Sequence, residues 1–437
     1  MRAGELFRAA VYLSPHARDQ PAATTAGGPE PQAASPALRR AQRLVRRGDW
    51  LLPSSRTLNL VDLARALAFY RGSRAPLRAG ARRLRDAIGT PEHLVFVLAD
   101  GLGCVSLDGL PAGSFLRSHQ AMVLRSVFPS STATALTSLT TAAWPGQHGV
   151  TGWWTHLPQL NAPGALLPFV SLPNTDGVQQ PLEALGVSPA DAFPLAPGAM
   201  ADNVAGASLL PKAIVGSVYS TYFGGKQQRI PYRTLDQAVD LAADRIASAR
   251  RPTYTYLYTP EPDESAHRFG TRHGHTRGAV THLDHALGRL AAQLPRTARL
   301  VVTGDHGLLD VAERQHHDLA SNDDLRMLMD APPSGDARVA YFRVQPDRHE
   351  AFIACFEESF EDRFLLLTIE DAERLHLFGP QPTDTATRAR LGTFVAISLG
   401  ADVFDFTLHQ GTSAGPLYAA HHSGLTPDEM LVPLVLA

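Results

Sequence analysis

The sequence predicts an α/β fold, in which helices flank a mostly parallel central sheet and a cap is inserted into the chain. Short apolar runs of strand length alternate with segments in which apolar residues recur at helical spacing. The apolar runs are nearly continuous, which is typical of strands buried on both faces of a parallel sheet. With 437 residues, of which 44% are hydrophobic, the chain is long enough for one large domain with insertions.

The N-terminal residues 1–50 predict a basic, disordered tail in front of a folded domain at 51–437. Residues 19–36 are rich in Ala, Pro, Gly, Thr and Gln and carry almost no large apolar side chains. Residues 39–47 are basic and indicate a solvated helix face. The apolar stretch 6–13 is too short for a signal peptide, so we expect a cytoplasmic protein.

Composition also limits the class of partner. The net charge of −2 argues against a general nucleic-acid or membrane-surface binder. No apolar run approaches the roughly 20 residues that span a bilayer. Eighteen histidines against two cysteines point to metal ligands rather than to a disulfide framework.

The regular elements follow from periodicity and from the length of each apolar run. Helices are expected over residues 58–70, 133–143, 235–247, 278–294 and 348–360. Strands are expected over residues 93–98, 122–127, 254–258, 298–302, 338–344, 394–398 and 431–436.

Residues 151–232 lose this periodicity and are rich in Pro, Gly and Asn. A long irregular insertion in a compact domain is usually a lid or a substrate-binding cap. The alternative is a structural excursion whose aromatic residues form a small core of their own. These aromatic residues are Trp153, Trp154, Tyr219, Tyr222 and Phe223.

Acidic and imidazole side chains follow three of the predicted strands. They are Asp100, Asp263 with His267, and Asp305 with His306, while His421 and His422 lie near the C-terminus. In open α/β sheets, ligands bind beyond the carboxyl ends of the strands. Carboxylates and neutral imidazoles are the ligands expected for zinc or a similar divalent ion. The spacing of Asp263 and His267 places both on one face if the segment is a helical turn.

A hydroxyl-rich segment, residues 128–135, joins a predicted strand to a predicted helix. The start of a helix offers unpaired N–H groups and the positive end of the helix dipole, which together suit a phosphate. A hydroxyl there can act as a nucleophile if its proton is removed. Ser131 or Thr132 has the simpler alternative role of a helix cap. Among possible nucleophiles, Ser131, Thr132 and Thr134 all remain open on these grounds.

Six motifs in the chain resemble, in their order, those of the alkaline phosphatase superfamily and of its type I phosphodiesterase / nucleotide pyrophosphatase family. They are Leu98-Ala99-Asp100-Gly101, Phe128-Pro129-Ser130-Ser131-Thr132, Trp144-Pro145-Gly146-Gln147-His148-Gly149, Glu261-Pro262-Asp263-Glu264-Ser265-Ala266-His267, Gly304-Asp305-His306-Gly307 and His422-Ser423-Gly424-Leu425. The resemblance covers roughly residues 93–437 and implies an alkaline-phosphatase-like fold.

The resemblance also implies a site with two divalent metal ions, zinc foremost, with manganese or iron as alternatives. One ion would be held by Asp263, His267 and His422 and the other by Asp100, Asp305, His306 and the hydroxyl of Thr132. Thr132 would be the catalytic nucleophile. His421 remains a rival to His422, which we prefer because Ser-Gly-Leu follows it as a similar tail does in relatives.

The function implied is a metal-dependent hydrolase of phosphodiester or pyrophosphate bonds, acting on a small-molecule phosphoester such as a nucleotide. Two metals roughly 4 Å apart can clamp the attacking and leaving oxygens of an in-line displacement. The alternatives are a phosphomonoesterase, phosphonate hydrolase or phosphomutase on the same scaffold, or a non-catalytic protein that binds metal and ligand. The sequence leaves open the physiological substrate, the metal, the oligomeric state and the role of the N-terminal tail.

Overall fold

A seven-stranded sheet forms the centre of the computed structural model, which describes residues 34–174, 176–196, 204–319, 322–405 and 417–437. Its strands, in sheet order, are β2 (Gln120–Arg125), β18 (Leu431–Leu436), β9 (Ala298–Thr303), β1 (His93–Ala99), β8 (Thr253–Thr259), β6 (Ala205–Pro211) and β7 (Gln228–Tyr232). The run from β9 to β7 is parallel, whereas β18 is antiparallel to both of its neighbours. The α/β class is confirmed, and the sheet is mixed. The antiparallel strand was not expected, because an apolar run does not reveal the direction of its strand.

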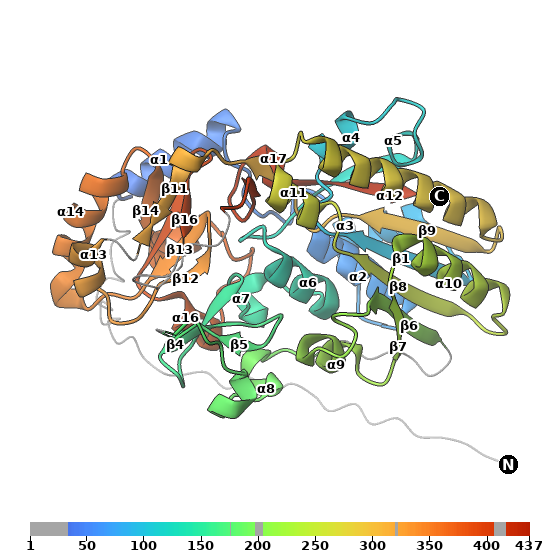
Figure 1. Ribbon diagram of the computed structural model, residues 1–437, viewed down its shortest axis with the longest axis horizontal. Helices are drawn as coiled ribbons and strands as arrows, with labels where there is room; N and C mark the ends of the chain where they lie inside the picture. The colour runs from blue at the N-terminus through green and yellow to red at the C-terminus, as the bar shows by residue number, and fades with distance from the viewer. Residues whose placement is uncertain (1–33, 175, 197–203, 320–321, 406–416) are drawn as a thin grey trace, which may run out of the picture. The chain divides into compact units, whose positions relative to one another are not determined.

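Helices cover both faces of this sheet (Figure 1), and alternate residues of β1 belong to different cores. Val95, Val97 and Ala99 pack with apolar residues of α10 (Leu235–Ala247) and α12 (Gly274–Gln293). Leu94, Phe96 and Leu98 pack with those of α2 (Leu60–Tyr70) and α6 (Thr132–Thr141). The longer helices are α1 (Pro36–Arg47), α2 (Leu60–Tyr70), α3 (Ala79–Ile88), α6 (Thr132–Thr141), α10 (Leu235–Ala247), α12 (Gly274–Gln293) and α14 (His349–Phe360). The shorter ones are α4 (Cys104–Asp108), α5 (Phe115–Ser118), α7 (Pro145–His148), α8 (Pro189–Ala192), α9 (Val218–Gly224), α11 (Asp263–Phe269), α13 (Asp323–Met327), α15 (Ile369–Arg374), α16 (Thr385–Leu391) and α17 (Pro427–Met430).

A second seven-stranded sheet is antiparallel throughout. In sheet order its strands are β14 (Phe364–Thr368), β15 (Phe394–Ser398), β13 (Val339–Phe342), β12 (Ser334–Asp336), β3 (Trp154–Leu157), β4 (Ala162–Ala165) and β5 (Val170–Ser171). Two short pairs complete the ladders: β10 (Leu309–Asp310) with β17 (Ala420–His421), and β11 (His316–Asp318) with β16 (Val403–Asp405).

The predicted cap at 151–232 does not form one separate insertion. Strands β3 to β5 join the second sheet, and β6 and β7 complete one edge of the central sheet. Strands β3 to β5 have at most four residues, and β4, Ala162-Pro163-Gly164-Ala165, contains Pro and Gly, so their partners rather than their own periodicity define them. Strands β6 and β7 are longer, with seven and five residues, and each contains Pro. Aromatic side chains from this stretch nevertheless line the large cavity beside the site described below.

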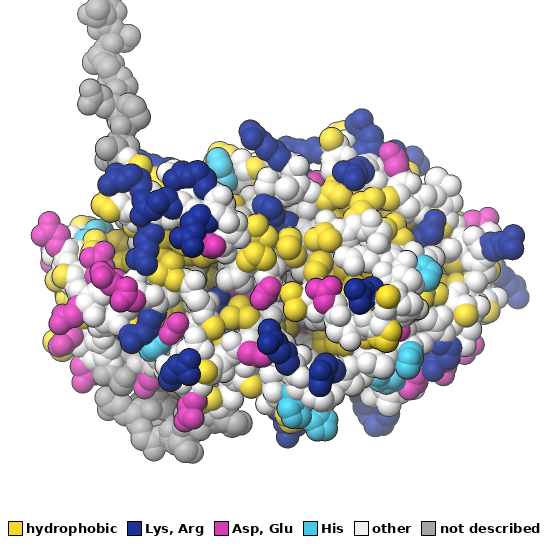
Figure 2. Space-filling view, turned by 90° about the horizontal axis from the view of Figure 1, so that it is seen from above, with side chains coloured by type: hydrophobic (Ala, Val, Ile, Leu, Met, Phe, Trp, Pro, Cys, Tyr) yellow, Lys and Arg dark blue, Asp and Glu magenta, His cyan; other side chains and the backbone are white. Residues whose placement is uncertain are grey.

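The predicted tail also differs from the structure in part. Residues 1–33 lie outside the described residues, but residues 36–47 form α1, with Leu38 and Ala41 buried, and Trp50 is buried as well. The arginines on the other faces of α1 hid this narrow apolar stripe in the sequence. None of the helices that the structure describes is both long and apolar enough to cross a bilayer. Charged side chains of both signs are spread over the face seen in Figure 2, with Lys and Arg gathered at one end of it.

A buried ion pair connects the two sheets. Arg338, between β12 and β13, donates from Nε to Oε1 of Glu429 at 2.6 Å, and both side chains are fully buried. Glu429 also accepts from the backbone N–H groups of Gly424 and Thr426 at 2.7 and 3.2 Å. The same carboxylate therefore fixes the second sheet and the loop that leads into β18.

Replacing Glu429 by Gln should be strongly destabilising, because it leaves the guanidinium of Arg338 buried beside an uncharged partner. Removing one partner of a buried pair costs about 3–5 kcal/mol. Urea unfolding followed by circular dichroism measures this loss. The matched control is Glu370→Gln, since Glu370 pairs with Arg388 at the surface and should contribute less than about 1 kcal/mol. Equal losses in the two variants would contradict our interpretation.

Candidate metal centre

Two groups of acidic and imidazole side chains lie together at the carboxyl ends of the central strands. One contains Asp263, His267 and His422, and the other contains Asp100, Asp305 and His306. Within each group, the atoms that could bind a metal lie within 4.8 Å of one another. The rings of His306 and His422 stack with their centroids 3.7 Å apart, so the two groups adjoin.

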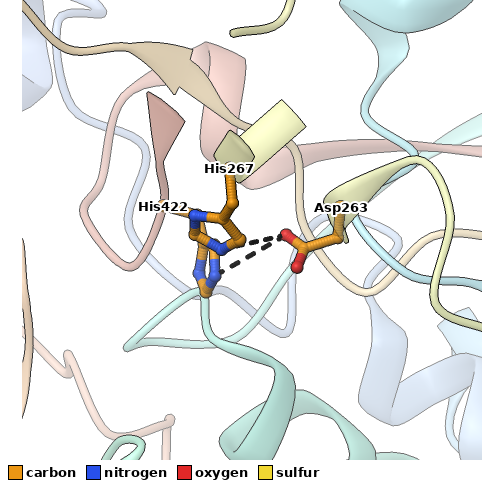
Figure 3. A group of neighbouring side chains, drawn as sticks. All are labelled: Asp263, His267 and His422. Carbon is orange, nitrogen blue, oxygen red and sulfur yellow. Dashed lines mark ion pairs between the residues drawn. The ribbon is translucent and has the colours of Figure 1, made fainter. Parts of the chain in front are cut away.

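The first group is assembled by α11 and by the loop after β17. Asp263 and His267 are four residues apart on α11, which places both on one side of the helix as the spacing predicts. Figure 3 shows both imidazoles pointing at the same carboxylate oxygen. The distances from Asp263 Oδ1 are 3.3 Å to Nε2 of His267 and 3.8 Å to Nε2 of His422.

The second group follows β1 and β9, which are neighbours in the sheet. His306 Nε2 lies 3.4 Å from Oδ1 of Asp100 and 3.4 Å from Oδ2 of Asp305. The hydroxyl of Thr132, the first residue of α6, lies 3.3 Å from Asp100 Oδ1 and 3.1 Å from His306 Nε2. A carboxylate pair, an imidazole and a threonine oxygen therefore converge on one point.

Backbone geometry allows this convergence at Gly101. Its φ is +70°, and a Cβ there would lie 2.9 Å from the Cβ of Asp263 and 2.7 Å from a methyl group of Leu308. The N–H of Asp263 in turn donates to the carbonyl of Asp100 at 3.0 Å. Only glycine lets the end of β1 approach the start of α11 this closely.

The hydrogen bonds of the three histidines fix which ring nitrogen is available as a ligand. Nδ1 of His267, His306 and His422 faces the carbonyl of Ala420, Gly307 and Ser130, at 2.7, 3.1 and 2.9 Å respectively. Because a carbonyl only accepts, each Nδ1 carries the hydrogen. In the neutral ring, Nε2 then presents a lone pair, and this arrangement is typical of metal-binding histidines.

Burial shifts pKa values in both groups. It raises the pKa of Asp263 and of Asp100 well above the usual value, and the neighbouring Asp305 adds to the rise at Asp100. Burial raises the pKa of Asp305 to about 6, although the N–H of Gly101 opposes it. Burial also lowers the pKa of His306 to about 4. The imidazole of His306 is therefore neutral at pH 7 and gives Asp100 and Asp305 no positive partner.

The residues present fit divalent cations. Asp263 Oδ1 and Asp305 Oδ2 are buried without a hydrogen-bond donor. Both lie against Nε2 lone pairs, where two electron-rich atoms repel each other unless a cation or a proton lies between them. Oxygen and imidazole donors in sets of three and four suit zinc, and also manganese or iron.

The structure places each predicted site residue. Asp100, Thr132, Asp263, His267, Asp305, His306 and His422 all lie in these two groups or in contact with them. His422, and not His421, belongs to the group with Asp263 and His267. His421 Nε2 is buried without a hydrogen-bond partner, and its ring centroid lies 5.5 Å from that of His267. The hydroxyl of Ser131 points elsewhere and donates to Asp336 at 3.1 Å.

Sequence reasoning missed two residues beside the site. Tyr258 of β8 donates its hydroxyl to Asp100 at 2.6 Å. Asp336 of β12 is buried and accepts from Ser131 and from the N–H of Trp153, at 3.1 and 3.0 Å. Burial raises the pKa of Asp336 to about 7. Tyr258 could have been found from its place at the end of a strand that leads to Asp263, whereas no sequence signal marks Asp336.

Paired Asp/His groups thus lie at the strand ends of an α/β scaffold, with a threonine hydroxyl beside one of them. A sequence model of the type I phosphodiesterase / nucleotide pyrophosphatase family matches residues 95–399. The chain therefore belongs to this family and is an enzyme of the phosphodiesterase / nucleotide pyrophosphatase type. A comparison with curated protein sequences gave no significant match.

Solved structures of ectonucleotide pyrophosphatase / phosphodiesterase 5 (ENPP5) share the fold. An inactive variant of the murine protein in complex with AMP superposes with a TM-score of 0.56 at 16% identity, covering 78% of this chain and 87% of that one. A second murine structure and a human structure, at 16% and 14% identity, each give a TM-score of 0.55 with the same coverage. At these identities the likeness concerns the fold.

His422 and His421 can be distinguished by metal content. His422→Ala removes a donor from the first group, so the purified protein should lose about one ion per chain if each group holds one. His421→Ala should retain the wild-type content, because its ring lies outside both groups. Elemental analysis of both variants, after the same dialysis, measures the difference. If only His421→Ala loses metal, His421 rather than His422 is the ligand.

Proposed function

We propose that the protein hydrolyses phosphodiester or pyrophosphate bonds of small molecules, with Thr132 as nucleophile and with one divalent cation in each group. The observation that carries this proposal is the position of the Thr132 oxygen, within 3.3 Å of both Asp100 and His306 and at the first residue of α6. Asp263, His267 and His422 would hold one cation, and Asp100, Asp305, His306 and Thr132 the other. Zinc is the ion we expect, with manganese as an alternative.

When bound, such cations lower the pKa of a hydroxyl and neutralise charge on the phosphate. The side chains of Asp100 and His306 position the Thr132 oxygen so that it faces the cavity. The N-terminus of α6 adds a partial positive charge beside the phosphate. The threonine oxygen bonds to phosphorus while the bond to the leaving alcohol or phosphate breaks, and the leaving oxygen takes up a proton. Water then cleaves the phosphothreonine ester and restores the hydroxyl.

The solved relatives support two parts of this proposal. The murine ENPP5 structure with AMP is that of an inactive variant in which a threonine is replaced by alanine. A threonine on which activity depends is what we propose for Thr132. The bound AMP makes nucleotide esters the first natural class to test.

Bond preference is measured with p-nitrophenyl esters in the presence of zinc or manganese. We expect the phosphodiester to have the higher kcat/KM, because the cavity beside Thr132 has room for a second substituent. Faster cleavage of the monoester would favour a phosphomonoesterase on the same scaffold. Absence of turnover on either ester, in protein that retains its metal, would favour a non-catalytic binding protein.

Thr132→Ala should lower kcat by on the order of a thousandfold or more, because no other oxygen occupies its place. Its metal content should remain high, since six of the seven proposed ligands are intact. Thr132→Ser restores a hydroxyl and should recover part of the activity. Ser131→Ala, whose hydroxyl points to Asp336, should stay within about tenfold of the wild type. Retained activity in Thr132→Ala would remove this residue from its role.

A further inference from the structure

A carboxylate outside the two metal groups lies close to the proposed nucleophile. Asp336 of β12 and Thr132 line the same cavity, whose volume is about 1430 Å³. The hydroxyl of Ser131, the residue before Thr132, donates to Oδ1 of Asp336 at 3.1 Å. Because neighbouring Cα atoms lie about 3.8 Å apart and both hydroxyl side chains are short, the carboxylate lies on the order of 10 Å from the threonine oxygen.

Both hydrogen-bond donors to Asp336 are uncharged. They are the hydroxyl of Ser131 and the backbone N–H of Trp153, at 3.1 and 3.0 Å. Only 7% of the surface of Asp336 is exposed, so water screens its charge poorly. Within the part of the chain that the structure describes, no cationic side chain contributes to the pKa of Asp336. Its negative charge is therefore not balanced locally.

The other charged side chains of the cavity lining, apart from the metal groups, are paired, exposed or placed over aromatic rings. Asp405 lies 3.3 Å from Nδ1 of His316, and Glu264 is exposed to water. The two arginines lie over rings, Arg71 over that of Tyr254 and Arg268 over that of Phe269, at 5.9 and 5.2 Å from the centroids. Asp336 thus combines burial with an unbalanced charge.

Holding Ser131 and Trp153 in place does not require a charge at Asp336. An amide at this position can accept from the N–H of Trp153 through its oxygen and donate to the hydroxyl of Ser131 through its nitrogen. It would also avoid the free-energy cost of burying a charge, which raises the pKa of Asp336 to about 7. The charge therefore has a consequence for the cavity that its hydrogen bonds do not account for.

A count of charges shows what that consequence is. Asp100, Asp263 and Asp305 carry three negative charges when ionised, against the four positive charges of two divalent cations. The surplus of one positive charge is balanced by a phosphodiester monoanion and exceeded by a phosphomonoester dianion. A further negative charge at Asp336 opposes the second charge of the dianion.

We propose that Asp336 is a specificity-determining residue, whose negative charge favours phosphates with one charge over phosphates with two. Phosphodiesters and the internal phosphates of substituted pyrophosphates belong to the first class, and terminal phosphates to the second. This inference rests on the proposed function, because it assumes that the phosphate reacts at Thr132.

The test compares methyl p-nitrophenyl phosphate with p-nitrophenyl phosphate, which share a leaving group and differ in charge. At about pH 8.5 the monoester is a dianion and Asp336 is ionised. Asp336→Asn should lower the diester-to-monoester ratio of kcat/KM about tenfold, because it removes one unit charge on the order of 10 Å from the phosphate. A ratio that stays the same or rises would overturn the proposal while leaving the proposed function intact.

Three further variants separate charge from geometry. Asp336→Ser, a second neutral replacement, should shift the ratio in the same direction. Ser131→Ala keeps the carboxylate and removes a hydrogen bond to it, so the ratio should persist. Asp347→Asn removes a charge from an exposed residue outside the cavity lining, and the ratio should again persist. An equal shift in Ser131→Ala and Asp336→Asn would attribute the effect to geometry and refute the role of the charge.

A binding measurement separates this proposal from catalysis. Metal-loaded Thr132→Ala, with and without Asp336→Asn, is titrated calorimetrically with phenyl phosphate and with methyl phenyl phosphate. Asp336→Asn should strengthen binding of the dianionic phenyl phosphate about tenfold more than binding of the monoanionic diester. If no ester is hydrolysed but this difference is found, the proposed function fails and the charge effect stands. Equal changes for the two ligands would refute it.

Discussion

The buried pair of Arg338 and Glu429 underlies much of the architecture around the site. The carboxylate of Glu429 fixes Gly424 and Thr426 through their N–H groups, and Arg338 joins it to the second sheet. The loop held in this way carries His422. It also contacts the segment before the nucleophile, because Ser130 donates its hydroxyl to the carbonyl of Gly424 at 2.9 Å. One desolvated ion pair therefore supports the histidine of one group and the approach to Thr132 in the other.

The centre itself combines burial with unbalanced negative charge. Asp100, Asp263 and Asp305 approach one another in a buried place, where burial makes each carboxylate expensive to ionise. The neighbouring imidazoles of His306 and His422 are kept neutral by the same burial and so give no compensation. A site of this kind is stable in its ionised form only with cations in place.

The sequence predicted the part of the fold that carries the chemistry, because that part has the clearest signals. Strands β1, β8 and β9 are apolar runs, and the acids that follow them are brought together by the sheet. The direction of β18 was not predictable, since antiparallel and parallel buried strands have the same composition. The second sheet was missed where its strands are short and rich in Pro and Gly, as in β4. Asp336 could not be found, because only the tertiary structure brings it to Ser131, 205 residues away in the chain.

The hydrogen bonds of Asp336 couple any movement of the second sheet to the segment around Thr132. Asp336 belongs to the second sheet, yet it bonds both to Ser131, next to the proposed nucleophile, and to the backbone of Trp153 at the cavity wall. A hinge motion of the second sheet would therefore pull on the segment that carries Thr132, the proposed nucleophile.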